Sequence, residues 1–321
     1  MELQTRLKIP QHPNPISYSS ETLLMGSCFA SHMGGKLSYY QFRNTLNPFG
    51  TLFHPRGICN LLERAKTGRY FKAEDCFYHM ERWHCHEVHS DLSHANREEM
   101  LKELNGKVDL TAELLSRVSH LVLTLGTAWG YVRKESGQWV ANCHKVPQRE
   151  FDKVLSSPQE IQQDLIKALD LVLEANPEIS VILTVSPVRH MRDGFVENQR
   201  SKSHLFVALH EVLEMYQDGG VTYFPAYELM MDELRDYRFY EMDMLHPNAL
   251  AVDYIWERFR SACIQSSENP IMARVEEIQK GLNHRPFNPG SKAYTSFAND
   301  LKEKIAGLKK EYPFMSFDTG L

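Results

Sequence analysis

Four short apolar runs, each followed by a glycine, serine or proline, stand out along the chain. They cover residues 22–25, 121–125, 181–185 and 221–224. Runs of this length between turn residues are typical of strands that are buried on both faces, as in a parallel sheet. We therefore expect four buried strands, which end at Gly26, Gly126, Ser186 and Pro225.

Helical periodicity fills the segments between these runs. The predicted helices cover residues 54–68, 157–177, 198–220 and 246–263. The second begins with Ser157 as N-cap and Glu160 completing a capping box, and the last is expected to start with Pro247 at its first position. Strands that alternate with helices predict a three-layer α/β/α sandwich with a mostly parallel central sheet of about five strands.

Residues 264–321 break this alternation. Residues 283–297 have the composition of a loop, and residues 298–312 have the pattern of an amphipathic helix. We therefore predict a main domain over residues 1–263 and a C-terminal extension over residues 264–321.

Composition and charge exclude several classes of protein. The net charge of −5 comes without a basic block, which argues against nucleic acid as a partner. No apolar run approaches the roughly 20 residues that span a bilayer, and the first 20 residues lack the order of a secretory signal. The six cysteines show no disulfide-scaffold spacing. We expect a cytoplasmic globular protein with reduced thiols.

The predicted fold can bring three residues with catalytic side chains to one edge of the sheet: Ser27, Asp243 and His246. Ser27 follows the first predicted strand, and the other two residues stand three apart just before the last helix. The carboxyl ends of parallel strands share an edge, where ligands bind. A serine hydroxyl becomes a nucleophile when a base removes its proton and a carboxylate orients that base.

Several strings of the sequence together resemble the GSCFA family, a branch of the SGNH (GDSL-type) hydrolase superfamily. They are "GSCFA" (26–30), "NPFGTLFHP" (47–55), "TLGTAWG" (124–130), "NCHKVPQREF" (142–151), "TVSPVRH" (184–190) and "DMLHPN" (243–248). The likeness covers about residues 20 to 263. It implies an SGNH/flavodoxin-like sheet and a Ser-His-Asp esterase without cofactor or metal, in which Ser27 is the nucleophile, His246 the base and Asp243 the acid.

The resemblance also implies an oxyanion hole, and here the sequence departs from the superfamily. Gly50 matches the glycine of the second block, so the backbone amides of Ser27 and Gly50 are expected to receive the oxyanion. The third block is Gly-x-Asn-Asp, but residues 126–129 read Gly-Thr-Ala-Trp. One such donor is typically worth about 3 to 4 kcal/mol in the barrier. Possible substitutes are Thr127, Asn47 and Asn142.

Further residues are expected near the site. By the resemblance, Asn142 and His144 become site candidates. Ser186, Arg189 and His190 lie just beyond the end of the third strand. Arg189 suits a carboxylate or sugar hydroxyls, and the alternative is an ion pair with an acid such as Glu228.

Alternative interpretations of these residues remain open. Ser27 can be a helix cap, Asp243 can cap the last helix, and Cys28 can be a thiol nucleophile or a small buried residue. The segment 79–94 holds five histidines. A metal-dependent hydrolase would use His84, His86, His89 and Asp91, whereas a histidine-rich surface segment needs no metal.

The sequence thus predicts a serine ester hydrolase or acyltransferase, with O-acylated carbohydrate as the first substrate class to test. The expected partner is a small-molecule or carbohydrate ester, with no nucleic acid and no membrane span. The two alternatives are a catalytically impaired scaffold that binds a glycan or lipid headgroup, and the metal-dependent hydrolase.

Overall fold

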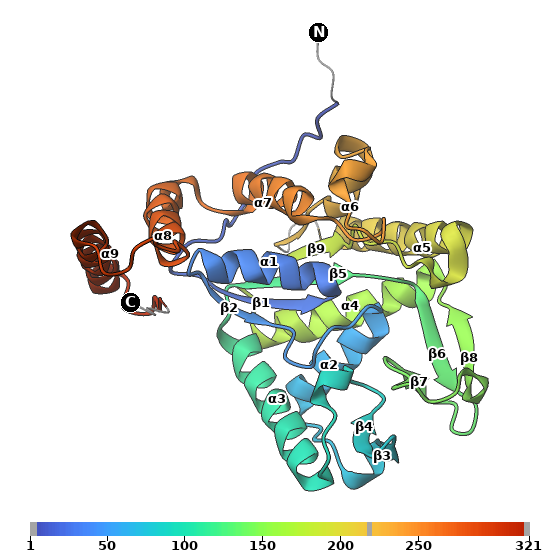
Figure 1. The fold of residues 1–321 in the computed structure, drawn as a ribbon. Helices are drawn as coiled ribbons and strands as arrows, with labels where there is room; N and C mark the ends of the chain where they lie inside the picture. Colours follow the sequence, from blue (N-terminus) through green and yellow to red (C-terminus); the bar gives the residue numbers. More distant parts are fainter. Residues whose placement is uncertain (1–4, 217–219, 318–321) are drawn as a thin grey trace.

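The central sheet is parallel and has five strands in the order β10-β9-β5-β1-β2 (Figure 1). The computed structural model describes residues 5–216 and 220–317. The strands are β1 (Glu21–Gly26), β2 (Arg43–Leu46), β5 (His120–Leu125), β9 (Ser180–Val185) and β10 (Val221–Tyr223). The four predicted strands are confirmed. The edge strand β2 was not predicted, because its sequence Arg-Asn-Thr-Leu is polar and short.

Helices cover both faces of the sheet, as expected of a three-layer sandwich (Figure 1). The helices are α1 (Cys28–Tyr39), α2 (Pro55–Thr67), α3 (Arg97–Arg117), α4 (Pro158–Ala175), α5 (Gly194–Met215), α6 (Ala226–Glu228), α7 (Ala249–Cys263), α8 (Asn269–Leu282) and α9 (Lys292–Glu311). Helices α2 to α5 share one apolar cluster with Leu23 and Leu121 of the sheet. Helices α1, α6 and α7 share the other with Leu24 and Val122.

The four predicted helices are present, with differences at their ends. Helix α4 begins with the predicted capping box between Ser157 and Glu160. Helix α5 begins at Gly194, four residues before the predicted start at residue 198. The prediction for the last helix was wrong at its start: α7 begins at Ala249, its N-cap is Asn248, and Pro247 lies outside it. Asn248 caps the helix because its side chain accepts a hydrogen bond from a first-turn amide.

Two small antiparallel sheets, which the periodicity did not predict, project from the sandwich (Figure 1). One is the hairpin of β3 (Cys76–His79) and β4 (Arg82–Cys85), and the other joins β6 (Trp129–Arg133), β7 (Trp139–Val140) and β8 (Phe151–Leu155). The second sheet is inserted between β5 and α4. It therefore begins at the carboxyl end of a central strand, where the site is expected.

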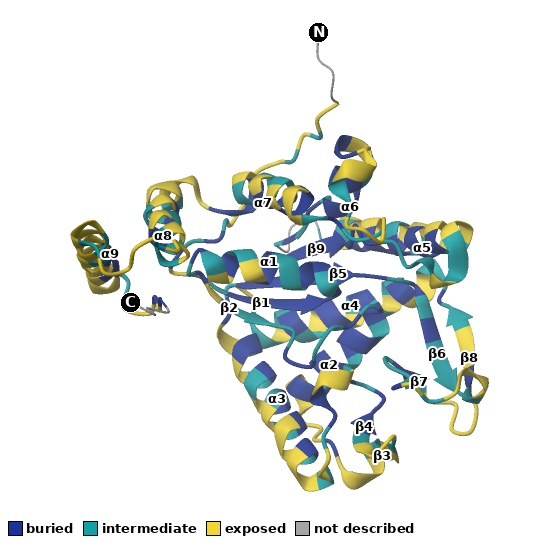
Figure 2. Cartoon of the chain, viewed as in Figure 1, coloured by how far each residue is buried: buried dark blue, intermediate teal, exposed yellow. Residues whose placement is uncertain are grey.

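The C-terminal segment contains two helices rather than one. Helix α8 was not predicted, and α9 begins six residues before the predicted start at residue 298. Met272 and Val275 of α8 and Leu308 of α9 are buried in the same cluster as Leu37 of α1, and Figure 2 shows buried positions on both helices. The domain boundary at residue 263 stays a prediction. No helix in the described part of the chain is long and apolar enough to cross a membrane.

Candidate active site

The turn between β1 and α1 can be made only by glycine. Gly26 has a φ of +136°, and a Cβ added there would lie 2.1 Å from the carbonyl oxygen of Thr124. The turn brings Ser27 to the N-cap position of α1, but its side chain makes no capping hydrogen bond. The side chain of Ser27 is therefore not used by the helix, and its cap role is limited to the backbone.

The hydroxyl of Ser27 is buried and unpaired. The residue is 0 % exposed, and among the described residues its Oγ finds no hydrogen-bond partner. Buried hydroxyl groups are nearly always paired, so an unpaired one requires an explanation. The structure does not join Ser27 to His246 by a hydrogen bond.

Asp243 and His246 form the expected carboxylate–imidazole pair. Asp243 Oδ2 lies 2.6 Å from His246 Nδ1, and Oδ1 accepts the backbone N–H groups of Leu245 and His246 at 2.9 and 3.0 Å. Hydrogen bonds from the His246 backbone and ring, and from the Leu245 amide, lower the pKa of Asp243 to about 2. The carboxylate thus stays charged and holds Nδ1, while Nε2 makes no hydrogen bond to the described residues. Asp243 does not cap α7, because Asn248 does.

The two backbone amides predicted for the oxyanion hole are already engaged, so this expectation needs correction. The N–H of Ser27 donates to Thr124 O at 3.0 Å, and the N–H of Gly50 donates to Asn47 O at 2.8 Å. Both bonds arise from the turns that place these residues. Neither amide is free to receive an oxyanion in this conformation.

Two of the three substitute donors are also engaged. Thr127 Oγ1 lies 2.9 Å from Ser201 Oγ and accepts the N–H of Trp129 at 3.0 Å. Asn142 Nδ2 donates to Ser90 Oγ at 3.2 Å. These contacts fix the loops at the ends of β5 and β7, so the side chains of Thr127 and Asn142 have structural roles here.

Asn47 is the substitute that keeps a free donor. Its Oδ1 accepts the N–H of Gly26 at 2.8 Å, and its backbone N–H donates to Leu24 O at 2.8 Å. These bonds hold a residue whose φ is +42°. Its Nδ2 is buried and has no hydrogen-bond partner in the described structure. Gly26 thus donates to Asn47, which keeps an unpaired amide donor, and directly precedes Ser27, which keeps an unpaired hydroxyl.

Lys202 is a buried residue at the carboxyl ends of the strands that the sequence analysis did not single out. It lies on α5, is 0 % exposed, and its Nζ donates to Gly126 O at 2.7 Å and to Ser186 O at 2.8 Å. Burial lowers its pKa to about 7. The signal was available, because the helical spacing places Lys202 on the same face as the buried Leu205 and Leu209.

The remaining edge residues lie near this lysine. The carbonyl oxygen of Ser186 accepts a hydrogen bond from Lys202 Nζ, and its Oγ accepts one from the N–H of Val188 at 3.3 Å. His190 packs edge-on against Phe53, and its Nε2 is buried without a partner. Burial, followed by the charges of Lys202 and His246, lowers the pKa of His190 to about 4.

Cys28 is the first residue of α1 and is partly buried. Burial raises the pKa of its thiol, and the nearby charge of Lys202 only reduces that shift. A thiol whose pKa is raised is a poor nucleophile at neutral pH, because the thiolate is the reactive form. The raised pKa thus argues against Cys28 as the nucleophile.

The histidine cluster is held together by hydrogen bonds that occupy its ring nitrogens. Both ring nitrogens of His84 contact Ser93 Oγ and His79 O, and both of His144 contact Ser90 Oγ and Cys85 O. His86 Nδ1 contacts Asn142 O at 2.9 Å, and His89 Nδ1 lies 3.1 Å from Asp91. In residues 5–216 and 220–317 no group of three or more His, Cys, Asp or Glu side chains could hold a metal ion. These contacts give His84 and His144, in which both ring nitrogens are engaged, a structural role.

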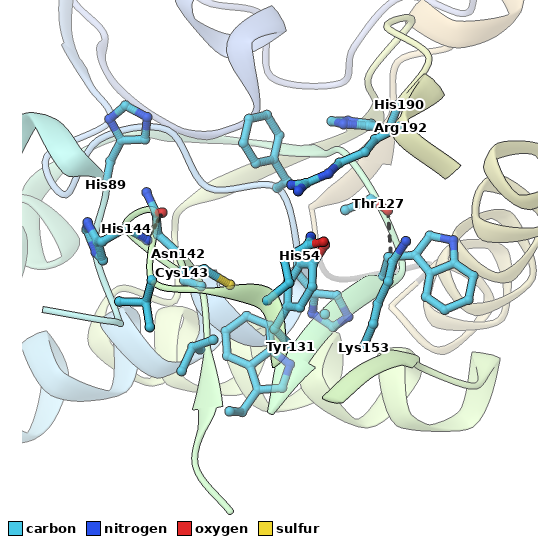
Figure 3. Close-up of a pocket in the computed structure, with 18 of the residues that line it drawn as sticks. His54, His89, Thr127, Tyr131, Asn142, Cys143, His144, Lys153, His190 and Arg192 are labelled. Atoms are coloured by element: carbon cyan, nitrogen blue, oxygen red, sulfur yellow. Dashed lines mark hydrogen bonds between the residues drawn. The ribbon is translucent and has the colours of Figure 1, made fainter. Parts of the chain in front are cut away.

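Two cavities flank the strand ends. The first, here called the aromatic cavity, has a volume of about 450 Å³ and is lined by Phe53, Trp129, Tyr131 and Trp139 together with polar side chains. Figure 3 shows His190 and Arg192 across it from Tyr131 and Lys153. The second, here called the Arg189 cavity, has a volume of about 480 Å³ and includes Asp243 in its wall.

The chain belongs to the GSCFA family. The model of that family matches residues 21–259, and the model of the C-terminal domain of GSCFA domain proteins matches residues 275–320. A search of curated proteins finds no match.

Several solved structures are distantly similar. One is a protein assigned as an acylhydrolase from Bacteroides fragilis, at 10% identity over 82% of this chain and 92% of that chain, with a TM-score of 0.40. A carbohydrate esterase of family 3 from Talaromyces cellulolyticus has 7% identity, covers 80% and 99%, and has a TM-score of 0.36. An acetyl xylan esterase from Butyrivibrio proteoclasticus has 11% identity, covers 77% and 65%, and has a TM-score of 0.38. At TM-scores below 0.5, no residue correspondence follows from these similarities.

Proposed function

We propose that this protein is a serine hydrolase that cleaves acyl esters. The observation that carries this proposal is the pair of buried, unpaired polar atoms beside Gly26, namely Ser27 Oγ and Asn47 Nδ2. The fold leaves a hydroxyl and an amide donor unpaired at the sheet edge. In the proposal, the ester carbonyl carbon meets the hydroxyl, and the carbonyl oxygen accepts a hydrogen bond from the amide.

In the proposed reaction, Ser27 Oγ attacks the ester carbonyl carbon while His246 Nε2 takes the hydroxyl proton. Asp243 holds Nδ1 of His246 and stabilises the imidazolium. The carbon–oxygen bond to the alcohol then breaks, and His246 returns the proton to the leaving oxygen. Water, or a second alcohol in an acyl transfer, repeats the sequence on the acyl-serine and restores Ser27.

His246 has to approach Ser27 for the first step. In this conformation the two are not hydrogen-bonded, and catalytic hydrogen bonds often shorten only once substrate is bound. The side chains of His246 and Asp243 are 44% and 47% exposed, so the 243–246 loop is not locked by burial. Substrate between Ser27 and this loop would complete the arrangement.

Asn47 takes the role of the missing third-block asparagine in this proposal. Its amide is held by the hydrogen bond from the Gly26 N–H to Oδ1, and its Nδ2 is left unpaired for the oxygen that gains charge. A fixed donor in a site that excludes water needs no reorganisation during the reaction.

The aromatic cavity supports a carbohydrate as the alcohol part of the ester. A sugar ring offers an apolar face to an aromatic side chain and hydroxyl groups to polar ones, and the cavity provides both. Trp129 and Tyr131 supply ring faces, whereas His190 Nε2 and Arg192 supply hydrogen-bonding groups. Its volume suits a small ligand.

Hydrolysis of 4-nitrophenyl acetate and O-acetylated xylose by the wild type, Ser27→Ala and His246→Ala tests this function. We expect activity in the wild type and a loss of at least a thousand-fold in kcat for each variant. Equal rates for the wild type and a folded Ser27→Ala protein would contradict the proposal.

One observation favours a second candidate, a catalytically impaired scaffold that binds a glycan. Ser27 Oγ is 0 % exposed and has no hydrogen bond to a base. The absence of hydrolysis in a folded wild type, together with quenching of tryptophan fluorescence by xylo-oligosaccharides, would support this function.

All six cysteines are free. This supports, but does not test, placement of the protein in a reducing compartment such as the cytoplasm.

A further inference from the structure

Arg189 is a positive charge without a counter-charge. One Nη contacts the sulfur of Met231 at 2.9 Å, its Nε is buried without a partner, and the Tyr227 hydroxyl lies beside it. In the described part of the chain no carboxylate lies within ion-pairing distance of this guanidinium. Partly buried arginines are normally paired, because the charge loses its hydration.

Four acidic residues of the segments around the cavity are engaged with other partners. Asp243 pairs with His246, Asp236 with Arg238, Asp232 with Arg235, and Glu228 accepts the hydroxyl of Tyr223. The ion pair between Arg189 and Glu228, considered from the sequence, is therefore wrong. Arg189 keeps an unpaired N–H group at Nε and has no ion-pair partner among these acids.

The lining of the Arg189 cavity suits a small acyl group. It holds about 480 Å³ and is walled by side chains that are mostly apolar or aromatic: Met191, Phe195, Met231, Tyr240, Met244 and Leu245. Asp243 is part of the same wall, and it is bonded to His246. The Arg189 cavity therefore adjoins the proposed base through Asp243. It shares no lining residue with the aromatic cavity.

We propose that the Arg189 cavity binds the acyl part of the substrate and that this acyl part carries an anionic group, held by Arg189. This inference rests on the proposed function and specifies its substrate class. A guanidinium pairs with planar carboxylates through two parallel hydrogen bonds, whereas the neighbouring methionine and tyrosine side chains suit methylene groups. Half-esters of short dicarboxylic acids combine these features.

The test compares two esters of the same alcohol and similar length, benzyl hydrogen succinate and benzyl valerate. Release of benzyl alcohol is measured by chromatography. We expect the wild type to prefer the succinate ester by ten-fold or more in kcat/KM. Arg189→Met should abolish the preference, by lowering kcat/KM for the succinate ester at least ten-fold relative to the valerate ester.

A matched control is Arg235→Met, since Arg235 lines the same cavity but is paired with Asp232 and 69% exposed. It should keep the preference. A wild type without preference, or an Arg189→Met variant that retains it, would overturn the proposal. A third substrate, 1-valeryl glycerol 3-phosphate, places the anion on the alcohol. Arg189-dependent preference for this ester over the succinate would overturn the assignment to the acyl part.

Binding to the Ser27→Ala protein separates this inference from the proposed function. Calorimetry with succinate should give an affinity that falls at least ten-fold in Ser27→Ala/Arg189→Met, with melting temperatures of both proteins compared. Arg189-dependent binding of succinate without hydrolysis of either ester by the wild type would support the anion site and reject the esterase function. Hydrolysis of both esters at equal rates, without succinate binding, would support the esterase and reject the anion site.

Discussion

At the residue scale, the candidate site depends on what the backbone around Gly26 leaves unpaired. The turn uses the N–H of Ser27 and the Oδ1 of Asn47, and it leaves Ser27 Oγ and Asn47 Nδ2 without partners. The sequence predicted the serine, the histidine and the aspartate from their order and type. It could not show which amides the turns had already used, because hydrogen-bond pairing depends on backbone geometry.

Asn47→Asp tests the proposed oxyanion donor. The carboxylate keeps an acceptor for the Gly26 N–H but loses the Nδ2 donor. We expect kcat to fall by about 10²- to 10³-fold with little change in KM, and the melting temperature to fall because the new carboxylate oxygen is buried without a donor. Asn44→Asp, on the neighbouring strand β2, is the matched control and should keep its activity. A normal kcat in Asn47→Asp would exclude the amide as a donor.

Gly26→Ala tests the strand-to-helix turn. The new Cβ would lie 2.1 Å from Thr124 O at a φ of +136°, so we expect a loss of about 3 kcal/mol or more in the free energy of unfolding. Gly35→Ala, at an exposed position of α1 with no atom within 4 Å, should instead stabilise by about 0.5 to 1 kcal/mol. Denaturant titration measures both, and similar effects of the two changes would argue against this turn.

At the element scale, the buried strands and long helices were predictable, whereas the small sheets were not. Strands β1, β5 and β9 are continuous apolar runs because both of their faces are covered. Strands β6 and β8 are partly exposed and carry a mixed pattern that periodicity cannot separate from a loop.

The histidines of the β3–β4 hairpin and the loop after β7 predict acid sensitivity. Burial lowers the pKa of His144 to about 4, below the value near 6.5 of an unfolded chain. The unfolded state therefore binds the proton first as the pH falls. The stabilisation is complete above pH 6.5 and is lost between pH 6.5 and 4, at no more than about 1.4 kcal/mol per pH unit for one group.

Denaturant titrations at several pH values measure this loss. His144→Gln should be less stable than the wild type at pH 7.5, and its stability should fall less steeply between pH 6.5 and 4. Parallel pH profiles for the two proteins would show that His144 does not contribute.

At the scale of the whole molecule, the strand order agrees with the predicted position of the candidate site. Along the sheet the order β2-β1-β5-β9-β10 reverses direction between β1 and β5, and ligands bind at such a switch point. Ser27 follows β1, and Gly126 follows β5. The motif order therefore sufficed to predict the sheet edge. The two cavities, in contrast, depend on the inserted sheet and on residues 189–195 and 231–245, which are mostly irregular or in short helical turns and whose side chains no periodic pattern orients.

The C-terminal helices are predicted to stabilise the same core as the sheet. Leu308 of α9 is 0 % exposed and belongs to the apolar cluster of α1 and α7. Leu308→Ala should cost about 2 to 5 kcal/mol in the free energy of unfolding. Leu250→Ala, at a position that is 60% exposed, should cost less than about 0.5 kcal/mol. Equal free energies of unfolding for the two variants would show that Leu308 of α9 does not stabilise the core.

The most direct test of the central claim, an activated Ser27, is covalent labelling with a fluorophosphonate probe. The modified peptide is mapped by mass spectrometry in the wild type, Ser27→Ala and His246→Ala. We predict one adduct on Ser27 in the wild type, none in Ser27→Ala, and labelling at least a hundred-fold slower in His246→Ala. A folded wild type that is not labelled, or an adduct on another residue, would contradict the claim.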